Sequence, residues 1–169
     1  MSSLQSKQEV VQEVHGVANG AHSLVLSEYH GLTVAQITSL RNAARSANVD
    51  IRVVKNTLAR LALKDTQFED AIPSLVGPII MAFSMSEEDP VAGARVIHNF
   101  LKEKANEKLV VKAIAHDGEV HEGSALKAIA SLPTKEEAIS MFLAVLKAPV
   151  QKLAATLASV RDKKEAEAA

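Results

Sequence analysis

The segment VDIRVVKNTLARLAL, residues 49–63, decides the fold because it joins two kinds of secondary structure without a break. Its first six residues alternate in character and are rich in β-branched side chains, which is typical of a strand. Asn56 follows as an N-cap residue and predicts a short helix over 57–63. The segment therefore predicts a strand that passes directly into a helix.

The same kinds of pattern continue on both sides of this segment. We expect strands over residues 23–29, 49–54, 79–84 and 109–115. We expect helices over residues 2–18, 34–46, 57–63, 90–105 and 124–132. Thr33 and Asp89 are the N-caps expected for two of the helices, and Asp117-Gly118 predicts a hairpin turn. Strands that alternate with helices indicate an α/β fold, with a central sheet flanked by helices.

Composition limits the kinds of protein that this chain can be. Its 169 residues suit one compact domain with an appendage, or two small domains. Apolar residues make up 47% but aromatic residues only 3%, so the core must consist of Val, Leu, Ile and Ala. The absence of cysteine excludes disulfides and thiolate metal sites. We find no signal peptide and no apolar run of the roughly 18 to 20 residues that span a bilayer, and we expect a cytoplasmic protein without a membrane partner.

The C-terminal part of the chain differs from the rest. Residues 134–166 contain no glycine and a single proline, Pro149, and Thr134 with Glu137 forms a capping-box pattern. A continuous helix here would be about 50 Å long, more than one small domain can cover. We therefore expect a domain over 1–133 and a long protruding helix over 134–169.

This helix carries apolar residues on one face, at intervals of three and four. The stripe consists of Ile139, Phe142, Leu146, Val150, Leu153, Leu157 and Val160, and Leu143 widens it to eight residues. An offset of eleven residues aligns Ile139 with Val150 and Phe142 with Leu153, which predicts two similar docking segments separated by a kink at Pro149. The stripe either packs against the chain's own domain or requires a partner.

Charge is distributed unevenly along the chain. The net charge of −1 is the sum of +3 for residues 1–64, −5 for 65–133 and +1 for 134–169. Residues 41–64 contain a single acid, Asp50, and six basic residues: Arg41, Arg45, Arg52, Lys55, Arg60 and Lys64. Basic side chains beside a helix start suit contact with a sugar-phosphate backbone, although they could also form an ordinary solvated surface.

Enzymatic signals are weak. Neither a phosphate-binding glycine loop nor a nucleophile elbow is present. The best candidate cluster is His116, Asp117, Glu119, His121 and Glu122, which could hold a metal ion or simply surround a polar turn. We therefore predict no cofactor, no metal and no catalytic residue.

Several motifs together resemble one known family. They are the Gly31-Leu32-Thr33 turn, the Leu40-Arg41 helix, the stretch from Arg52 to Leu58, Arg60, Gly77-Pro78, Leu132-Pro133-Thr134 and Val160-Arg161-Asp162. From end to end the chain resembles the bacterial stalk-base proteins, the tenth protein family of the large ribosomal subunit. At position 30, where the resemblance leads us to expect arginine, this chain has His30.

The resemblance implies an α/β domain that binds the GTPase-associated region of large-subunit ribosomal RNA, beside the eleventh large-subunit protein. It places the RNA contacts at Gly31, Arg41, Arg45, Arg52, Lys55, Asn56, Thr57 and Arg60. It further implies that the C-terminal stripe binds dimers of the acidic stalk proteins, which recruit translational GTPases. With two docking segments we expect two dimers per chain. Members of the family also bind the leader of their own messenger, which implies a second role in repression.

Two other functions are compatible with the sequence. The chain could be a protein-binding adaptor that does not bind RNA, with its basic cluster serving only solubility. It could also be a small metal-dependent enzyme that uses the cluster between His116 and His121.

Overall fold

A computed structural model describes residues 4–103 and 108–168, with side chains as far as Lys163. The predicted helix ends at residues 2 and 105, and residue 169 of the expected C-terminal helix, lie outside this described part. The chain divides into two compact units, Met1–Leu132 and Pro133–Ala169.

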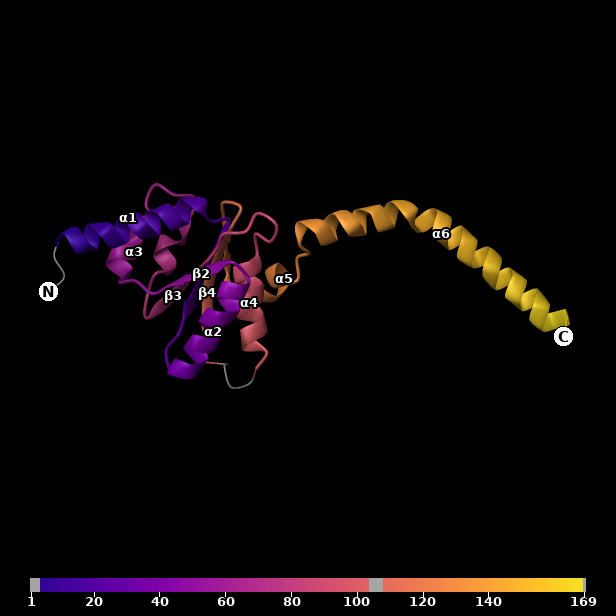
Figure 1. The fold of residues 1–169 in the computed structure, drawn as a ribbon, viewed down its shortest axis with the longest axis horizontal. Coiled ribbons are helices and arrows are strands. Elements are labelled where there is room, and N and C mark those ends of the chain that lie inside the picture. The colour runs from indigo at the N-terminus through magenta and orange to yellow at the C-terminus, as the bar shows by residue number, and fades with distance from the viewer. Residues whose placement is uncertain (1–3, 104–107, 169) are drawn as a thin grey trace. The chain divides into compact units, whose positions relative to one another are not determined.

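The first unit is built on one antiparallel sheet (Figure 1). Its strands are β1 (Ser23–Glu28), β2 (Val49–Arg52), β3 (Ile79–Ser84), β4 (Val110–His116) and β5 (Glu119–Glu122). They lie in the order β2-β3-β1-β4-β5, so β1 is the central strand and β2 and β5 form the edges. The α/β fold class predicted from the sequence is confirmed.

Helices cover both faces of this sheet. The unit contains α1 (Leu4–Gly20), α2 (Val34–Ser46), α3 (Asn56–Leu63), η1 (Glu69–Ser74), α4 (Ala92–Leu101), η3 (Gly123–Ala125) and α5 (Leu126–Ala130). Leu24 and Leu26 of β1 pack with α1, α3 and η1, whereas Val25, between them, packs with α2, α4 and α5. Because successive side chains of a strand point to opposite faces, β1 and β3 are buried on both sides.

Several expected elements are confirmed, together with their local causes. Thr33 caps α2 in a capping box with Gln36, with the two side chains accepting reciprocal backbone hydrogen bonds. The β4–β5 turn has positive φ at Asp117 (54°) and Gly118 (79°), as an Asp-Gly hairpin turn requires.

Other boundaries were wrong. β2 ends at Arg52 rather than at residue 54, and α3 begins at Asn56 with Lys55 as its N-cap. Asn56 does not cap the helix because its side-chain amide donates to the carbonyls of Leu75 and Gly77 instead. Likewise α4 begins at Ala92 with Val91 as its N-cap.

Asp89 does not cap α4 because its carboxylate forms an ion pair with Arg95. The sequence also did not predict strand β5 or the 3-10 helix η1. The helix expected over 124–132 is shorter, as the segment divides into η3 and α5.

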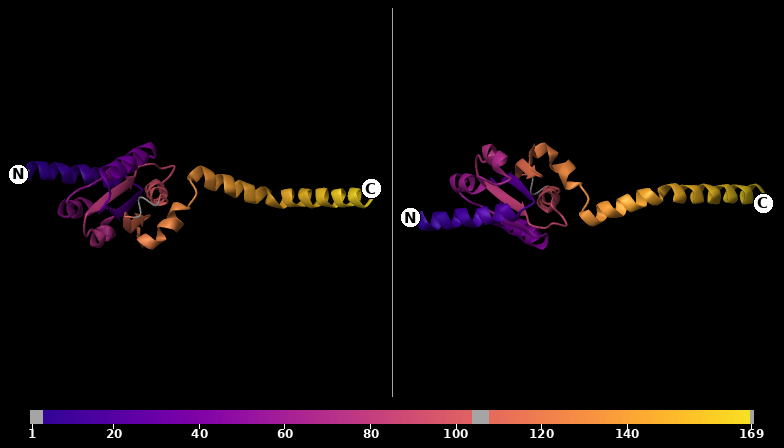
Figure 2. Two further views of the ribbon diagram at one scale, coloured as in Figure 1. Left: turned by 90° about the horizontal axis from the view of Figure 1, so that it is seen from below. Right: turned by 90° about the horizontal axis from the view of Figure 1, so that it is seen from above.

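The second unit consists of helix α6 (Lys135–Ala168). The predicted capping box is present, since Thr134 N donates to Glu137 Oε2 at 3.0 Å and Glu137 N donates to Thr134 Oγ1 at 3.3 Å. Figures 1 and 2 show one uninterrupted helix that changes direction in its middle part. Pro149 lies inside this helix, and an interior proline removes a backbone hydrogen bond and bends the axis.

Helix α6 has no uninterrupted apolar run of membrane-spanning length, but residues 135–163 are long and apolar enough, by length and composition only, to cross a membrane. The reason is that alanines and the stripe residues together raise the apolar content of the helix, although charged side chains interrupt it.

Gly123, at the start of η3 in the first unit, tests how closely η3 packs against the sheet. A Cβ at this position would lie 2.0 Å from Val111 O of β4, so the backbone must shift to accept any side chain. We expect Gly123→Ala to lower the free energy of unfolding by about 2 kcal/mol or more, measured by denaturant unfolding. Gly16→Ala in α1 is the matched control, because a Cβ there meets nothing within 4 Å. It should raise stability by about 0.5–1 kcal/mol, and equal effects of the two changes would contradict the packing described.

Candidate nucleic-acid interface

The antiparallel register brings four loops to one end of the sheet. Glu28, the last residue of β1, pairs with Ile79 at the start of β3 and with Val110 at the start of β4. Arg52, the last residue of β2, pairs with Met81. Residues 29–33, 53–57, 77–78 and 108–109 therefore lie at the same end, which we call the junction end.

Gly31 marks a close approach at the junction end. It has a φ of +84°, which residues other than glycine rarely adopt, and a Cβ there would lie 3.2 Å from Lys108 Cδ. Lys108 was missed by the sequence reasoning because it belongs to a segment with a net negative charge. Only the pairing of β1 with β4 places this lysine beside the glycine turn.

The start of α3 forms the second part of the junction end. Lys55 is exposed and stands at the N-cap, and Thr57 is exposed in the first turn. The side chain of the N-cap residue, Lys55, forms no capping hydrogen bond. Leu58 N donates to Lys55 O at 2.8 Å, so the first turn presents the N–H groups of Asn56 and Thr57 to an anion, and the helix dipole assists them.

Asn56 and Arg60 have structural contacts that the sequence did not reveal. The Asn56 amide donates to Gly77 O at 3.0 Å and to Leu75 O at 3.4 Å. Arg60 Nη2 donates to the same Leu75 carbonyl at 3.0 Å. Both side chains therefore tie the segment before β3 to α3, whatever else they contact.

Arg41, Arg45 and Arg52 come together at a different place. With residues 49–51 they line a hollow of about 330 Å³ beside edge strand β2, which we call the arginine hollow. Arg52 Nε donates to Asp50 Oδ2 at 2.9 Å, and Arg52 Nη1 donates to Glu13 Oε1 of α1 at 2.6 Å. These two hydrogen bonds hold the pKa of Arg52 above its usual value, so the guanidinium keeps its charge.

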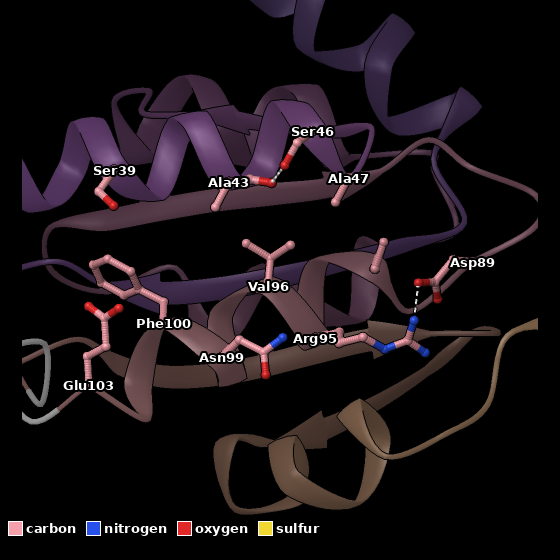
Figure 3. A pocket seen from close by; sticks show the side chains of 11 residues that line it. Ser39, Ala43, Ser46, Ala47, Asp89, Arg95, Val96, Asn99, Phe100 and Glu103 are labelled. Atoms are coloured by element: carbon pink, nitrogen blue, oxygen red, sulfur yellow. Dashed lines mark hydrogen bonds and ion pairs between the residues drawn. The ribbon is translucent and has the colours of Figure 1, made fainter.

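A second hollow lies between α2 and α4 (Figure 3). It measures about 440 Å³ and is lined by small residues of α2 and by Val96, Asn99 and Phe100 of α4. Arg95 points toward Asp89, and their side chains form an ion pair of 2.5 Å across one end. Because that arginine is neutralised locally, this hollow lacks the basic surplus of the arginine hollow.

The residues around the β4–β5 turn do not form a metal centre. Within the described part of the chain, no group of three or more His, Asp or Glu side chains is placed to hold a metal ion. His121 Nε2 lies 3.9 Å from Glu119 Oε2, as expected for neighbours on one face of β5. At this distance the two side chains make a loose contact on the exposed edge strand.

All eight residues of the predicted stripe on α6 are exposed. Their exposed fractions run from 51% for Val160 to 72% for Val150. Met141 and Val145 add further exposed apolar surface to the first half of the helix. A contiguous apolar surface of this kind marks an interaction site.

Comparison with known proteins decides the family. The family model for ribosomal protein L10 matches residues 2–102, and the model for the C-terminal region of ribosomal protein uL10 matches residues 132–168. This chain belongs to the uL10 family of large-subunit ribosomal proteins. The resemblance inferred from the junction and C-terminal motifs is confirmed.

Bacterial members of the uL10 family match the chain along nearly its whole length. The large ribosomal subunit protein uL10 of Dichelobacter nodosus is 54% identical over 166 residues, which cover 96% of this chain and 97% of the relative. That of Alkalilimnicola ehrlichii is 50% identical, covering 95% and 90%. That of Hydrogenovibrio crunogenus is 49% identical, covering 98% of both.

Membership of the uL10 family sets the coarse function. The chain is a structural protein of the large ribosomal subunit and not an enzyme, so the metal-dependent enzyme considered from the sequence is wrong. The family also associates the chain with the ribosome and its RNA. Which of its residues contact RNA stays a prediction.

The hydrogen bonds of Asn56 to Leu75 O and Gly77 O, which we call the tether between α3 and the segment before β3, can be tested without RNA. We expect Asn56→Ala to lower the free energy of unfolding by about 1–2 kcal/mol, because two carbonyls lose a donor. Thr57→Ala changes the next, exposed position and should stay within about 0.5 kcal/mol. Denaturant unfolding of both variants measures the difference. No loss in the Asn56 variant would show that the tether contributes nothing.

Proposed function

We propose that this protein forms the base of the large-subunit stalk. Its first unit binds the GTPase-associated region of large-subunit ribosomal RNA, and α6 carries dimers of the acidic stalk proteins. The observation that carries the proposal is the exposed apolar stripe along α6, in a ribosomal protein whose first unit already has a complete core of its own.

Binding to RNA rests on the exposed cations and the helix start of the first unit. Lys55 and Thr57 at the junction end, and Arg41 and Arg45 in the arginine hollow, are exposed to solvent. Contacts between basic side chains and phosphates release bound counterions, so binding must weaken as salt rises. Asn56 and Arg60 contribute by holding the segment before β3, and Gly31 by allowing the close turn.

A salt titration tests this part of the proposal. We expect the wild-type protein to bind a GTPase-associated RNA fragment tightly at low salt, and Arg52→Ala/Lys55→Ala to bind more weakly. The slope of log K against log salt should fall by about one unit for each phosphate that the variant no longer neutralises. The matched control is Lys147→Gln/Lys152→Gln, which removes two charges from α6 and should leave the slope unchanged.

If the wild-type protein fails to bind the fragment even at low salt, the RNA part of the proposal is wrong. The protein would then act as an adaptor that holds the stalk proteins without contacting this RNA.

Binding of the stalk proteins rests on the two halves of the stripe. Ile139, Phe142 and Leu146 precede Pro149, and Val150, Leu153 and Leu157 repeat their spacing after an offset of eleven residues. A bend at Pro149 gives each half its own direction. Each half therefore holds one dimer by burying its apolar face against the helices of the partner.

Native mass spectrometry of the reconstituted complex counts the dimers. We expect two dimers on the wild-type chain, and one on either Phe142→Glu or Leu153→Glu, because a charge in the buried face removes one docking segment. Gln151→Glu adds the same charge beside the stripe and should keep both dimers. A wild-type complex with one or three dimers, or equal loss in the control, would contradict the assignment.

The resemblance to the stalk-base proteins extends this proposal to a neighbour, an indirect action and a second role. The protein lies beside the eleventh large-subunit protein, and it acts on translational GTPases indirectly, through the stalk that it carries. By the same RNA-binding surface it represses its own synthesis, through the leader of its messenger.

A further inference from the structure

Three arginines line the arginine hollow, and two carboxylates hold one of them, Arg52, before any ligand arrives. Arg41 and Arg45 come from consecutive turns of α2, and Arg52 comes from edge strand β2. Three guanidinium groups around one small hollow offer more N–H donors than a single phosphate can accept. Of the residues that line the hollow, Asp50 alone is acidic.

The position of Arg52 is controlled from two elements. Asp50, two residues away on β2, accepts from Nε, and Glu13, on α1, accepts from Nη1. These contacts use two of the five guanidinium N–H donors and leave three, including both on Nη2. The side chain is about one-third exposed, and its contacts with the two carboxylates restrict its rotation.

We propose that the arginine hollow binds one phosphate group of the RNA backbone, and that Glu13 and Asp50 are positioning residues that hold Arg52 for it. This inference rests on the proposed binding to RNA and deepens it. A long arginine side chain loses considerable rotational freedom when it binds, and a guanidinium that is already held loses less. The carboxylates therefore strengthen binding to an anion even though they carry the same sign of charge.

The positioning role and simple electrostatics predict opposite effects of Glu13→Gln on RNA binding. Glu13→Gln removes an exposed negative charge near the RNA, which by itself should tighten binding by no more than about twofold at 0.15 M salt. If Glu13 holds Arg52, the same change weakens binding instead. We expect a loss of about threefold to tenfold, the size of a weakened charge-assisted hydrogen bond.

The experiment measures binding of the full-length chain to the GTPase-associated RNA fragment at fixed salt. The variants are Glu13→Gln, Arg52→Gln and the double variant, with Glu9→Gln as the matched control. Glu9 is also exposed and lies one helical turn from Glu13, so its substitution removes the same charge without releasing Arg52. Thermal unfolding of each variant identifies any loss of affinity that follows from loss of structure.

Three results together would support the proposal. Glu13→Gln binds the RNA more weakly than the wild type, and Glu9→Gln binds it as tightly as the wild type. Adding Glu13→Gln to Arg52→Gln causes no further loss of affinity. Non-additivity of this kind shows that Glu13 acts through Arg52. Equal or tighter binding in Glu13→Gln, or a loss that persists in the absence of Arg52, overturns the positioning role alone. Unchanged binding in Arg52→Gln shows that the hollow faces something other than RNA, such as an acidic protein, and overturns the phosphate site. A wild-type protein that does not bind the fragment overturns this inference together with the RNA part of the proposed function.

Discussion

The antiparallel pairing of β1 with both β3 and β4 is the constraint on which the rest of this structure depends. Because β1 is central and buried on both faces, it fixes where the ends of three strands meet. That convergence places the turn at Gly31, the Gly77-Pro78 segment and Lys108 at one end of the sheet. Pairing of β2 with the far side of β3 then leaves β2 as an edge strand. Arg52 lies on that open edge, where it can reach a carboxylate on α1.

Some side chains of the basic segment, residues 41–64, stabilise the fold, and others stay exposed to solvent. Arg60 and Asn56 use their donors on backbone carbonyls of the segment before β3. A guanidinium that donates to a carbonyl keeps its charge, so Arg60 still adds to the positive potential of the surface. Arg41 and Arg45 remain exposed on α2. The density of positive charge in the sequence therefore overstates the number of side chains that are free to bind a ligand.

Local signals predicted the parts of this fold that have local causes. Thr33 found its partner three residues away, and the Asp117-Gly118 turn needed only the backbone freedom of its two residues. Side chains whose roles depend on distant partners could not be predicted in this way. Asn56 resembles an N-cap by type, but its acceptors lie 19 and 21 residues along the chain. The partner of Arg52 on α1 is 39 residues away, so nothing near Arg52 in the sequence indicated it.

The charged residues of α6 favour a protein partner over a membrane as the surroundings of its apolar stripe. Residues 135–163 have the length and apolar content of a membrane span, but Lys147 and Lys152 flank Pro149 near the middle of that stretch. In a bilayer each of these lysines would cost about 2.5–3.5 kcal/mol near the centre, and proline would leave a carbonyl without a donor. Against a protein partner only one face of the helix is covered, so both ammonium groups stay in water. The stripe residues lie exposed along the helix, and in the proposed function it is the stalk dimers that cover them.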